Sequence, residues 1–572
     1  MRLPILNTVS KNREMMSAFG GYHHDLVISD NEFYDEENLS SDSYPALTPR
    51  EQRKKIRDFT RLDGFCVNNG LCWVDNGKVF YNGDQVSGDV EKSRKQMLSM
   101  GAYVLIWPDK KYINTEKVSE GVGSLEKSFT TTAAVSFTLT RVTGDDYNPT
   151  VSATAPEEPT NGDSWLDTSS KPHTLKIYAA ATKMWNAVAT TFVKISSAGI
   201  GEGFSEYDGV TISGCKDEQF NTNMILYAVS KDYIVVTGFI DEVSSQQEAV
   251  TVKRTVPDMD FVTESENRIW GCSSDKHEIY CCKIGDPFNW NCFLGLASDS
   301  YAVTVGTHGK FTGAFTMRGY ILFFKEDCVH KVYGSKPSNF QVTNESIRGV
   351  QNGSERSLAL CNETLYYKSR NGICAYDGGT PVNISESFGA NAYRNAVAGA
   401  IDNKYYVSMS DENGKYSLFT YDERTKIWHK ESGLKIDAFA PLDGELYFTV
   451  GNSLWTMHGT TRYSVTDQTY DEKPVEWMAE SGPIGVSSPD NKYISKLQFR
   501  LSVERGAQFR VQIQYDSMGD YEEVLHIDAV NNRTITIPII VRRCDHMKIR
   551  MRGKGKFILY SIAKVTEQGS EI

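Results

Sequence analysis

Turn residues followed by short runs of β-branched and aromatic residues recur at a nearly constant spacing in the second half of this 572-residue chain. Successive turns are 52, 43, 41 and 41 residues apart and lie at Asn267, Gly319, Asn362, Asn403 and Gly444. A repeat of about forty residues, made of strand pairs without intervening helices, is typical of β-propeller blades. One blade cannot bury both faces of its sheet alone, so blades must stack around a common axis. The repeat therefore predicts a toroidal β-scaffold.

Two further turns extend the repeat toward the N-terminus. Gly70 belongs to the first of three Asn-Gly dipeptides in the segment 67–86, and Gly101 precedes a run of apolar and aromatic residues. Asn-Gly between alternating apolar residues is a strong signal of a β-hairpin. With the five later turns, these positions predict seven blades; six is equally consistent, because terminal strands often share a closing blade. We therefore expect an all-β chain with a six- or seven-bladed propeller formed by residues 61–118 and 258–461.

The spacing is interrupted once, between Gly101 and Asn267. These two residues are 166 positions apart, so about 125 residues are inserted between two blades. Strand-like alternation in this region predicts an inserted β-domain over residues 119–257, most simply a small β-barrel. A Pro-rich entry and two short strands that each end near an aromatic residue predict a compact nested module at 151–196.

The two ends of the chain have different patterns. Residues 1–60 are rich in turn formers and acids without a sustained period, which predicts an extended arm that packs along another surface. A basic run in this arm is interpreted as a solvated face, or as a way to pin the arm to an acidic neighbour; it consists of Arg50, Arg53, Lys54, Lys55 and Arg57. Residues 462–572 alternate persistently over six or so strands, which predicts a β-sandwich.

Charge is distributed unevenly along the chain. The net charge is −12, which argues against tight binding of nucleic acid. From Lys492 to Lys564 there are fourteen Lys and Arg against seven Asp and Glu, so this part carries about +7 and the remainder about −19. Opposite charge on two parts of one chain favours self-assembly or docking to a charged partner. The alternative is a solvated sheet of mixed charge.

No motif predicts catalysis or a cofactor. Some propellers are glycosidases, but the S-x-D-x-G-x-x-W hairpin of sialidase-type propellers is absent, and no pair of carboxylates stands out. The clustered cysteines Cys272, Cys281, Cys282 and Cys292 lack the paired C-x₂₋₄-C spacing of a zinc site. We therefore expect no metal, no cofactor and no enzymatic activity; a propeller glycoside hydrolase is the least favoured reading.

Three aromatic residues of the nested module are the candidate binding residues. Trp165, Tyr178 and Trp185 lie within about forty residues, in a module that projects from the propeller. Aromatic side chains stack on sugar rings, so these three could contact a glycan. A domain this small also needs large aromatics for its own core, and that interpretation is favoured.

Nothing in the sequence predicts a membrane segment. No apolar stretch reaches the roughly 18 residues that a membrane-spanning helix needs. The segment from Met1 to Phe19 carries charges where a secretory signal would need an unbroken apolar run. We expect a protein that is made and assembled in a cytoplasm, and that stays there or leaves without the usual export route.

Several phrases resemble a family of bacteriophage tail structural proteins, found in phages and prophages of Gram-positive bacteria. They are F-G-G from Phe19 with the acidic phrase that ends at Arg50, E-N-R-I-W-G-C from Glu266, the phrase that ends in P-F-N-W at Trp290, and R-R-C-D-H from Arg542 with the terminal G-S-E-I. N-G-D-S-W-L-D-T from Asn161 with M-W-N-A-V resembles a small module of phage tail and fibre proteins.

The resemblance implies a virion structural protein of the tail. A propeller with an insert and a β-sandwich is similar to the nozzle proteins of short-tailed phages, which form a ring, generally of six copies, that extends the channel for DNA ejection. The implied partners are further copies of the chain, tail adaptor or portal-side proteins, tail fibres and the genomic DNA that passes through. The alternative is a tail protein that binds host-surface glycans through the inserted module.

Overall fold

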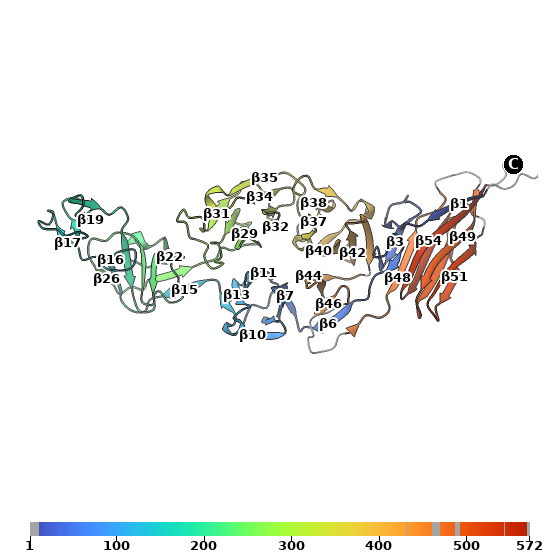
Figure 1. Cartoon of the computed structure of the whole chain (residues 1–572), viewed down its shortest axis with the longest axis horizontal. Helices are drawn as coiled ribbons and strands as arrows, with labels where there is room; N and C mark the ends of the chain where they lie inside the picture. The colour runs from blue at the N-terminus through green and yellow to red at the C-terminus, as the bar shows by residue number, and fades with distance from the viewer. Residues whose placement is uncertain (1–10, 432, 460–469, 487–491, 543, 569–572) are drawn as a thin grey trace, which may run out of the picture.

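The computed structural model describes residues 11–431, 433–459, 470–486, 492–542 and 544–568. Four β-units follow one another along the long axis in Figure 1: a small module, a larger insert, the propeller and a terminal sandwich. Helices in the described residues are limited to five 3₁₀ turns: η1 (Val118–Glu120), η2 (Glu218–Phe220), η3 (Pro337–Asn339), η4 (Glu355–Ser357) and η5 (Glu386–Phe388). The predicted all-β class is confirmed.

Seven antiparallel sheets form the propeller, and the insert lies in the chain between blades 2 and 3. Blade 1 consists of β7 (Leu62–Val67), β8 (Leu71–Asp75), β9 (Lys78–Tyr81) and β10 (Asp84–Asp89). Blade 2 consists of β11 (Gln96–Met100), β12 (Tyr103–Trp107), β13 (Lys111–Asn114) and β14 (Gly123–Ser124). After the insert, blade 3 consists of β28 (Phe261–Ser265), β29 (Arg268–Ser273), β30 (Glu278–Cys281) and β31 (Tyr301–Thr304). Blade 4 consists of β32 (Gly313–Met317), β33 (Tyr320–Phe324), β34 (Val329–Tyr333) and β35 (Gln341–Glu345).

The remaining blades complete the ring. Blade 5 consists of β36 (Ala359–Cys361), β37 (Thr364–Ser369), β38 (Gly372–Tyr376) and β39 (Val382–Asn383). Blade 6 consists of β40 (Arg394–Ile401), β41 (Lys404–Ser410), β42 (Tyr416–Asp422) and β43 (Ile427–Glu431). Blade 7 combines β44 (Ile436–Leu442), β45 (Glu445–Val450) and β46 (Ser453–Thr456) with β6 (Lys54–Asp58) and β47 (Tyr470–Asp471).

All seven turns identified from the sequence lie between the first and second strand of a blade, which fixes the blade count at seven. Each pair of neighbouring blades encloses its own apolar cluster, as a stack of sheets with two buried faces requires. The cluster between blades 7 and 1 includes Ile56 from β6, so a strand from the range predicted as arm closes the ring.

The insert begins after blade 2 and returns to blade 3. One of its sheets has the order β15 (Lys127–Thr130), β27 (Thr251–Arg254), β22 (Gly209–Ser213) and β23 (Asn223–Ile225). The other has the order β24 (Ala228–Ser230), β25 (Tyr233–Thr237), β21 (Phe192–Ser196), β16 (Val135–Thr140) and β26 (Ser244–Gln246). Both sheets contribute to one core that includes Val135, Val193 and Val252.

The nested module is a four-stranded sheet at the far end of the molecule (Figure 1). Its strands are β17 (Thr150–Ser152), β18 (Ser164–Asp167), β19 (Thr174–Ala179) and β20 (Met184–Ala187). Strand β21 lies inside the range predicted for this module, but it pairs with β16 and β25 and so belongs to the larger insert.

The sandwich combines C-terminal strands with strands of the N-terminal arm. The first sheet has the order β1 (Lys11–Met16), β54 (Phe557–Gln568), β49 (Lys492–Val503) and β52 (Arg533–Ile540). The second has the order β2 (Gly21–Tyr22), β3 (Glu32–Glu37), β48 (Glu476–Ser481), β53 (Met547–Lys554), β50 (Gln508–Tyr515) and β51 (Met518–Asp528). A short ladder of β4 (Leu39–Ser40) and β5 (Thr48–Pro49) continues the arm.

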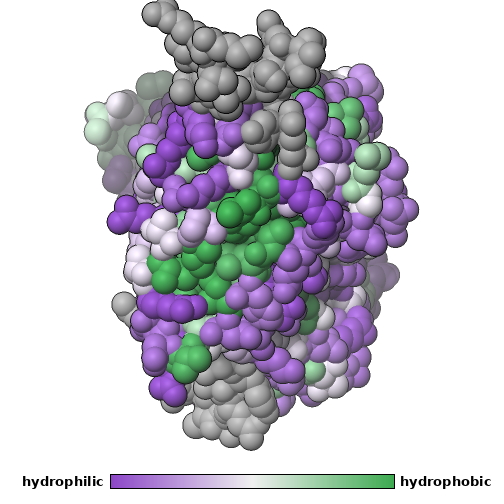
Figure 2. All heavy atoms as spheres, turned by 90° about the vertical axis from the view of Figure 1, so that its right-hand side faces the viewer, coloured by the Kyte–Doolittle hydropathy of each residue, from purple (hydrophilic) through white to green (hydrophobic). Residues whose placement is uncertain are grey.

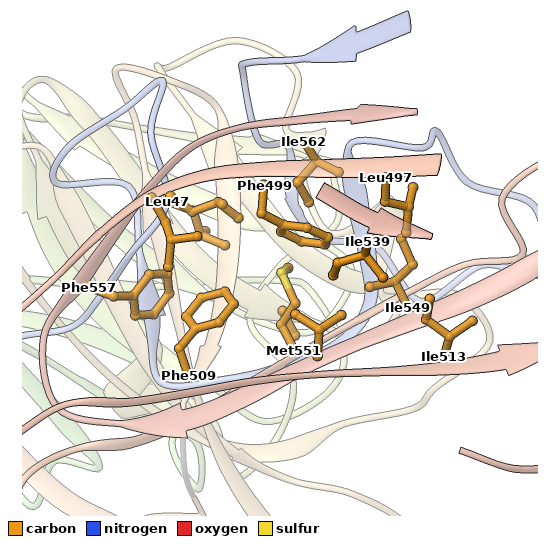
Figure 3. Close-up of a cluster of buried hydrophobic side chains, with 14 of the residues drawn as sticks. Leu47, Leu497, Phe499, Phe509, Ile513, Ile539, Ile549, Met551, Phe557 and Ile562 are labelled. Carbon is orange, nitrogen blue, oxygen red and sulfur yellow. The ribbon is translucent and has the colours of Figure 1, made fainter. Parts of the chain in front are cut away.

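Aromatic and aliphatic side chains from both sheets fill the sandwich (Figure 3). Phe509 lies 5.2 Å from Trp477 and 5.3 Å from Phe557, measured between ring centroids. Leu47 of the arm packs into the same core. The range 1–60 therefore holds strands of the sandwich and of blade 7 as well as connecting segments.

Candidate functional site

The three candidate aromatics of the nested module lie on one face of its sheet. Trp165 of β18 is opposite Lys176 of β19, and Tyr178 of β19 is opposite Trp185 of β20. Since side chains two residues apart on a strand share a face, Lys176 and Tyr178 point the same way. The ring centroids of Trp165 and Trp185 are 5.4 Å apart, and those of Tyr178 and Trp185 are 5.3 Å apart. The structure thus brings all three residues together.

Trp165 has a structural environment. Trp165 is only 6% exposed, and its Nε1 donates a hydrogen bond to the carbonyl of Ser152 at 3.0 Å. The ammonium of Lys176 lies 4.7 Å from the ring centroid and forms an ion pair of 2.7 Å with Asp167. Hydrogen bonds from Lys176 and Ser169 lower the pKa of Asp167 to about 2. Trp165 therefore stabilises the module itself.

Tyr178 and Trp185 remain half-buried. They form a tilted aromatic pair on strands β19 and β20, at the end of the molecule farthest from the sandwich (Figure 1). A pair of this kind offers an apolar surface with polar N–H and O–H groups at its border, which is the chemistry that a sugar ring can stack on. Of the three predicted residues, these two have the exposure that a ligand contact requires.

A second cluster of contacts, made by the side chain of Arg356, reaches across the axis of the propeller. Arg356 lies in η4, in the connection between blades 4 and 5, and its guanidinium donates to the carbonyl of Asp437 at 2.8 Å and to that of Lys95 at 3.2 Å. Asp437 belongs to blade 7 and Lys95 precedes blade 2, so both lie on the other side of the ring. Burial and the nearby charge of Arg94 lower the pKa of Arg356 to about 10.

Arg356 therefore obstructs the propeller axis. Beside it lies a pocket of about 320 Å³, lined among others by Arg94, Trp107, Asp260 and Glu355. The sequence around Arg356 gave no sign of this role, because its partners are backbone carbonyls of distant blades.

Two residues of the basic run, Arg50 and Arg53, are buried at the junction of arm and propeller. Arg50 makes two hydrogen bonds of 2.8 Å to the carboxylate of Glu472, and its Nε lies 3.3 Å from Glu431. Arg53 pairs with the same Glu431, at the end of β43. Of the two interpretations of this run, pinning to an acidic neighbour is right for Arg50 and Arg53.

A neighbouring pair extends this junction. His429 of β43 contacts Glu36 of β3 through Nδ1 at 2.9 Å, and the same carboxylate oxygen accepts from the backbone N–H of Lys430 at 2.9 Å. Both side chains are buried. Blade 6 is therefore joined to the sandwich by buried hydrogen bonds to Glu36 as well as by the covalent chain.

The cysteines lie in apolar surroundings rather than in a shared site. All eleven are free, and ten are buried. Burial raises the pKa of Cys281 to about 12 and raises that of Cys282 well above its ordinary value. Metal ligands and nucleophiles are thiolates, which such burial disfavours. Within the described ranges, no group of three or more His, Cys, Asp or Glu side chains could hold a metal ion.

None of the helical turns in the described parts of the chain has the length and hydropathy needed to cross a bilayer.

Comparison with known proteins gives a likeness of fold only. No family model and no curated protein matches the sequence. BamB from Moraxella catarrhalis is 8% identical over 73% of this chain and 99% of its own, with a TM-score of 0.33. Raptor from Chaetomium thermophilum is 10% identical over 71% and 29% of the two chains, with a TM-score of 0.30. An exo-β-1,3-galactanase from Phanerochaete chrysosporium is 10% identical over 52% and 95%, with a TM-score of 0.21. Values this low carry no argument about a shared site or activity.

Proposed function

We propose that this chain is a structural protein of a bacteriophage tail, and that copies of it assemble into a ring around the channel through which DNA leaves the virion. The phrases that resemble phage tail proteins support the tail assignment. The observation that carries the ring is the obstruction of the propeller axis by Arg356, which donates to carbonyls across the ring at 2.8 and 3.2 Å. If DNA passes this protein, it passes between copies.

The charge of the chain suits that arrangement. A conduit for DNA must not bind it, and the parts outside Lys492–Lys564 carry a net charge of about −19. Acidic walls repel phosphate over a Debye length of roughly 8–10 Å at physiological salt. The ion pairs of Arg50 and Arg53, together with the buried contact of His429 with Glu36, hold the two large units together, which a scaffold under load requires. The proposed role is non-catalytic, with the ring most simply a hexamer.

Negative-stain imaging of the purified full-length chain, and of virions that contain it, tests the proposal. We expect closed rings of about six copies in the purified protein and a matching ring in the tail. Protein that stays monomeric at every concentration and salt condition tried, together with virions that lack the chain, would refute the proposed function.

A second candidate function is binding of host-surface glycans through the nested module. It is favoured by the half-buried pair Tyr178 and Trp185 at the far end of the molecule. In a glycan array with the full-length chain, Trp185→Ala and Tyr178→Ala should each lower the signal about fivefold or more, since stacking on an aromatic contributes of the order of 1 kcal/mol or more. Absence of binding by the unmodified chain at millimolar sugar would exclude this function.

A further inference from the structure

The sandwich is closed on one side and open on the other. On the closed side, Phe19, Phe33 and Leu47 of the arm are buried in the core. On the other side, β51 and β52 are the last strands of their sheets, and the connection 529–532 joins them. Four of their residues pack against the core and yet stay partly exposed: Val524, Leu525, Ile535 and Ile537. We call this region the β51–β52 groove.

More apolar surface surrounds the groove. Ile540, at the end of β52, is 85% exposed, and Val530, in the connection, is also largely exposed. Figure 2 looks onto this end of the molecule and shows a contiguous apolar area framed by hydrophilic residues. Single exposed apolar residues are common, but a contiguous area of this kind marks a contact surface.

The backbone of β52 limits how the groove is covered. Pro538 lies inside this edge strand and has no N–H to donate. Proline on an edge strand interrupts pairing with a further strand, so it protects the sheet from open-ended extension. A partner is therefore expected to cover the groove with side chains rather than to continue the sheet.

The opposite edge of the same domain carries an exposed apolar loop. The loop 23–31 joins β2 to β3 and carries Leu26 and Val27 in its middle, where they are 87% and 85% exposed. The strands β2 and β51 are the two edges of one six-stranded sheet, and five spacings of roughly 4.8 Å place them about 24 Å apart. Groove and loop thus lie on opposite sides of the sandwich.

The loop is held in place at both ends. The backbone N–H of His23 donates to the carbonyl of Phe33 at 2.8 Å, and that of Ser29 donates to the carboxylate of Glu32 at 2.9 Å. Ile28 lies against Gly482 of the sandwich. A loop fixed in this way presents its two apolar side chains without a large loss of conformational entropy on binding.

We propose that the β51–β52 groove of one copy receives Leu26 and Val27 of a second copy. This inference rests on the proposed assembly and names its interface. A closed ring of more than two copies needs two different surfaces on each subunit, and the groove and the loop are two such surfaces on opposite sides of one domain. The contact is apolar rather than electrostatic, since β51 and β52 carry four carboxylates and one Arg, and segment 25–32 carries three carboxylates. The three most exposed large apolar side chains of the described residues are Leu26 and Val27 on the loop and Ile540 beside the groove.

Three variants of the full-length chain test the inference. Leu26→Asp with Val27→Asp removes the loop contact, and Ile540→Asp removes a groove contact; all three side chains are exposed, so the fold is expected to survive. Val382→Asp is the matched control, an exposed valine on blade 5. By mass photometry, the first two variants should associate about 30-fold or more weakly than the unmodified chain, the size of loss expected at an interface hot spot, and the control should not.

Mixing the two defective variants gives the decisive result. One retains an intact groove and the other an intact loop, so a head-to-tail interface predicts 1:1 dimers that grow no further, although each variant alone is monomeric. Variants that still form rings, or a mixture without dimers, would overturn the inference while leaving the proposed function standing. An unmodified chain that never assembles would instead refute the proposed function itself.

Discussion

Replacement of Arg53 by methionine is expected to loosen the junction of arm and propeller. Arg53 precedes β6 and is buried, and it pairs with Glu431, which is buried as well. The same carboxylate lies 3.3 Å from Nε of Arg50 and accepts a hydrogen bond from the hydroxyl of Thr420 at 2.7 Å. Methionine keeps an unbranched apolar stem of similar reach and removes only the cation. The variant therefore isolates the ion pair from the packing.

The expected loss of stability depends on the hydrogen-bond partners that Glu431 keeps in the variant. Removal of one partner of a buried pair costs about 3–5 kcal/mol, because a buried charge is left uncompensated. Glu431 still has Arg50 and Thr420, so we expect the lower end, about 3 kcal/mol, for Arg53→Met. In Glu431→Gln two buried guanidinium groups share the single carboxylate of Glu472, and we expect a loss nearer 5 kcal/mol. Burial lowers the pKa of Arg53, and the nearby carboxylate of Glu431 opposes this effect.

Native-state hydrogen exchange is the appropriate assay, since a chain with several units does not unfold in a single two-state step. A loss of about 3 kcal/mol should speed exchange in β6 and β43 by a factor of the order of 100, with little change in the nested module. The control is Lys556→Met, which breaks an exposed pair of 3.0 Å with Glu51 of the arm. We expect the control to change stability by less than about 1 kcal/mol.

Two outcomes would refute this reasoning. The first is an effect of Arg53→Met no larger than that of Lys556→Met. The second is additivity in the double variant Arg53→Met with Glu431→Gln. If the pair acts as a unit, the double variant should lose clearly less than the sum of the single losses, because no unpaired carboxylate remains.

Three further predictions follow from the described contacts. Phe509→Ala should cost the sandwich about 3–5 kcal/mol in denaturant unfolding, because the ring is fully buried between two other aromatics. Arg356→Met should speed exchange near the propeller axis by roughly tenfold, since two carbonyls lose a charged donor at a cost of about 1–3 kcal/mol. Burial disfavours the His23 cation, but hydrogen bonds to Asp25 and Glu32 outweigh burial and raise its pKa. The stabilisation is therefore present below the unfolded value near 6.5 and is lost as pH rises through the higher folded pKa, which an NMR titration of His23 should show and His23→Ala should abolish.

The sequence predicted the blades because their signal is local. A turn such as Gly319 or Gly444, where φ is positive, joins two strands that are neighbours in the chain, and the apolar runs beside it identify both. The strand that closes the ring carries no such signal. Within β6 the sequence is K-K-I-R-D, with one apolar residue, and its partner β46 lies almost four hundred residues further on.

The candidate site residues also fall into those that the sequence could identify and those that only the structure shows. Trp165, Tyr178 and Trp185 could be found from composition, because aromatics are few in a forty-residue module. Which of the three is exposed enough to contact a ligand could not be predicted from the sequence. That depends on the Ser152 carbonyl that accepts from Trp165 and on the register that pairs Tyr178 with Trp185. Arg356 could not be found at all. Its two acceptors are main-chain carbonyls, and every residue type supplies those.

The arm links assembly to the completion of folding. Strand β3 pairs with β48, so the loop that carries Leu26 and Val27 takes its position only when residues 476–481 are in place. The β51–β52 groove likewise needs β49, which pairs with β52, and β50, which pairs with β51. Contacts of long sequence separation, such as that of β3 with β48, form late, because the closure of long loops must precede them. Both halves of the proposed interface therefore appear only after the C-terminal part of the chain has folded. An incomplete chain would have neither surface, and rings would recruit finished subunits alone.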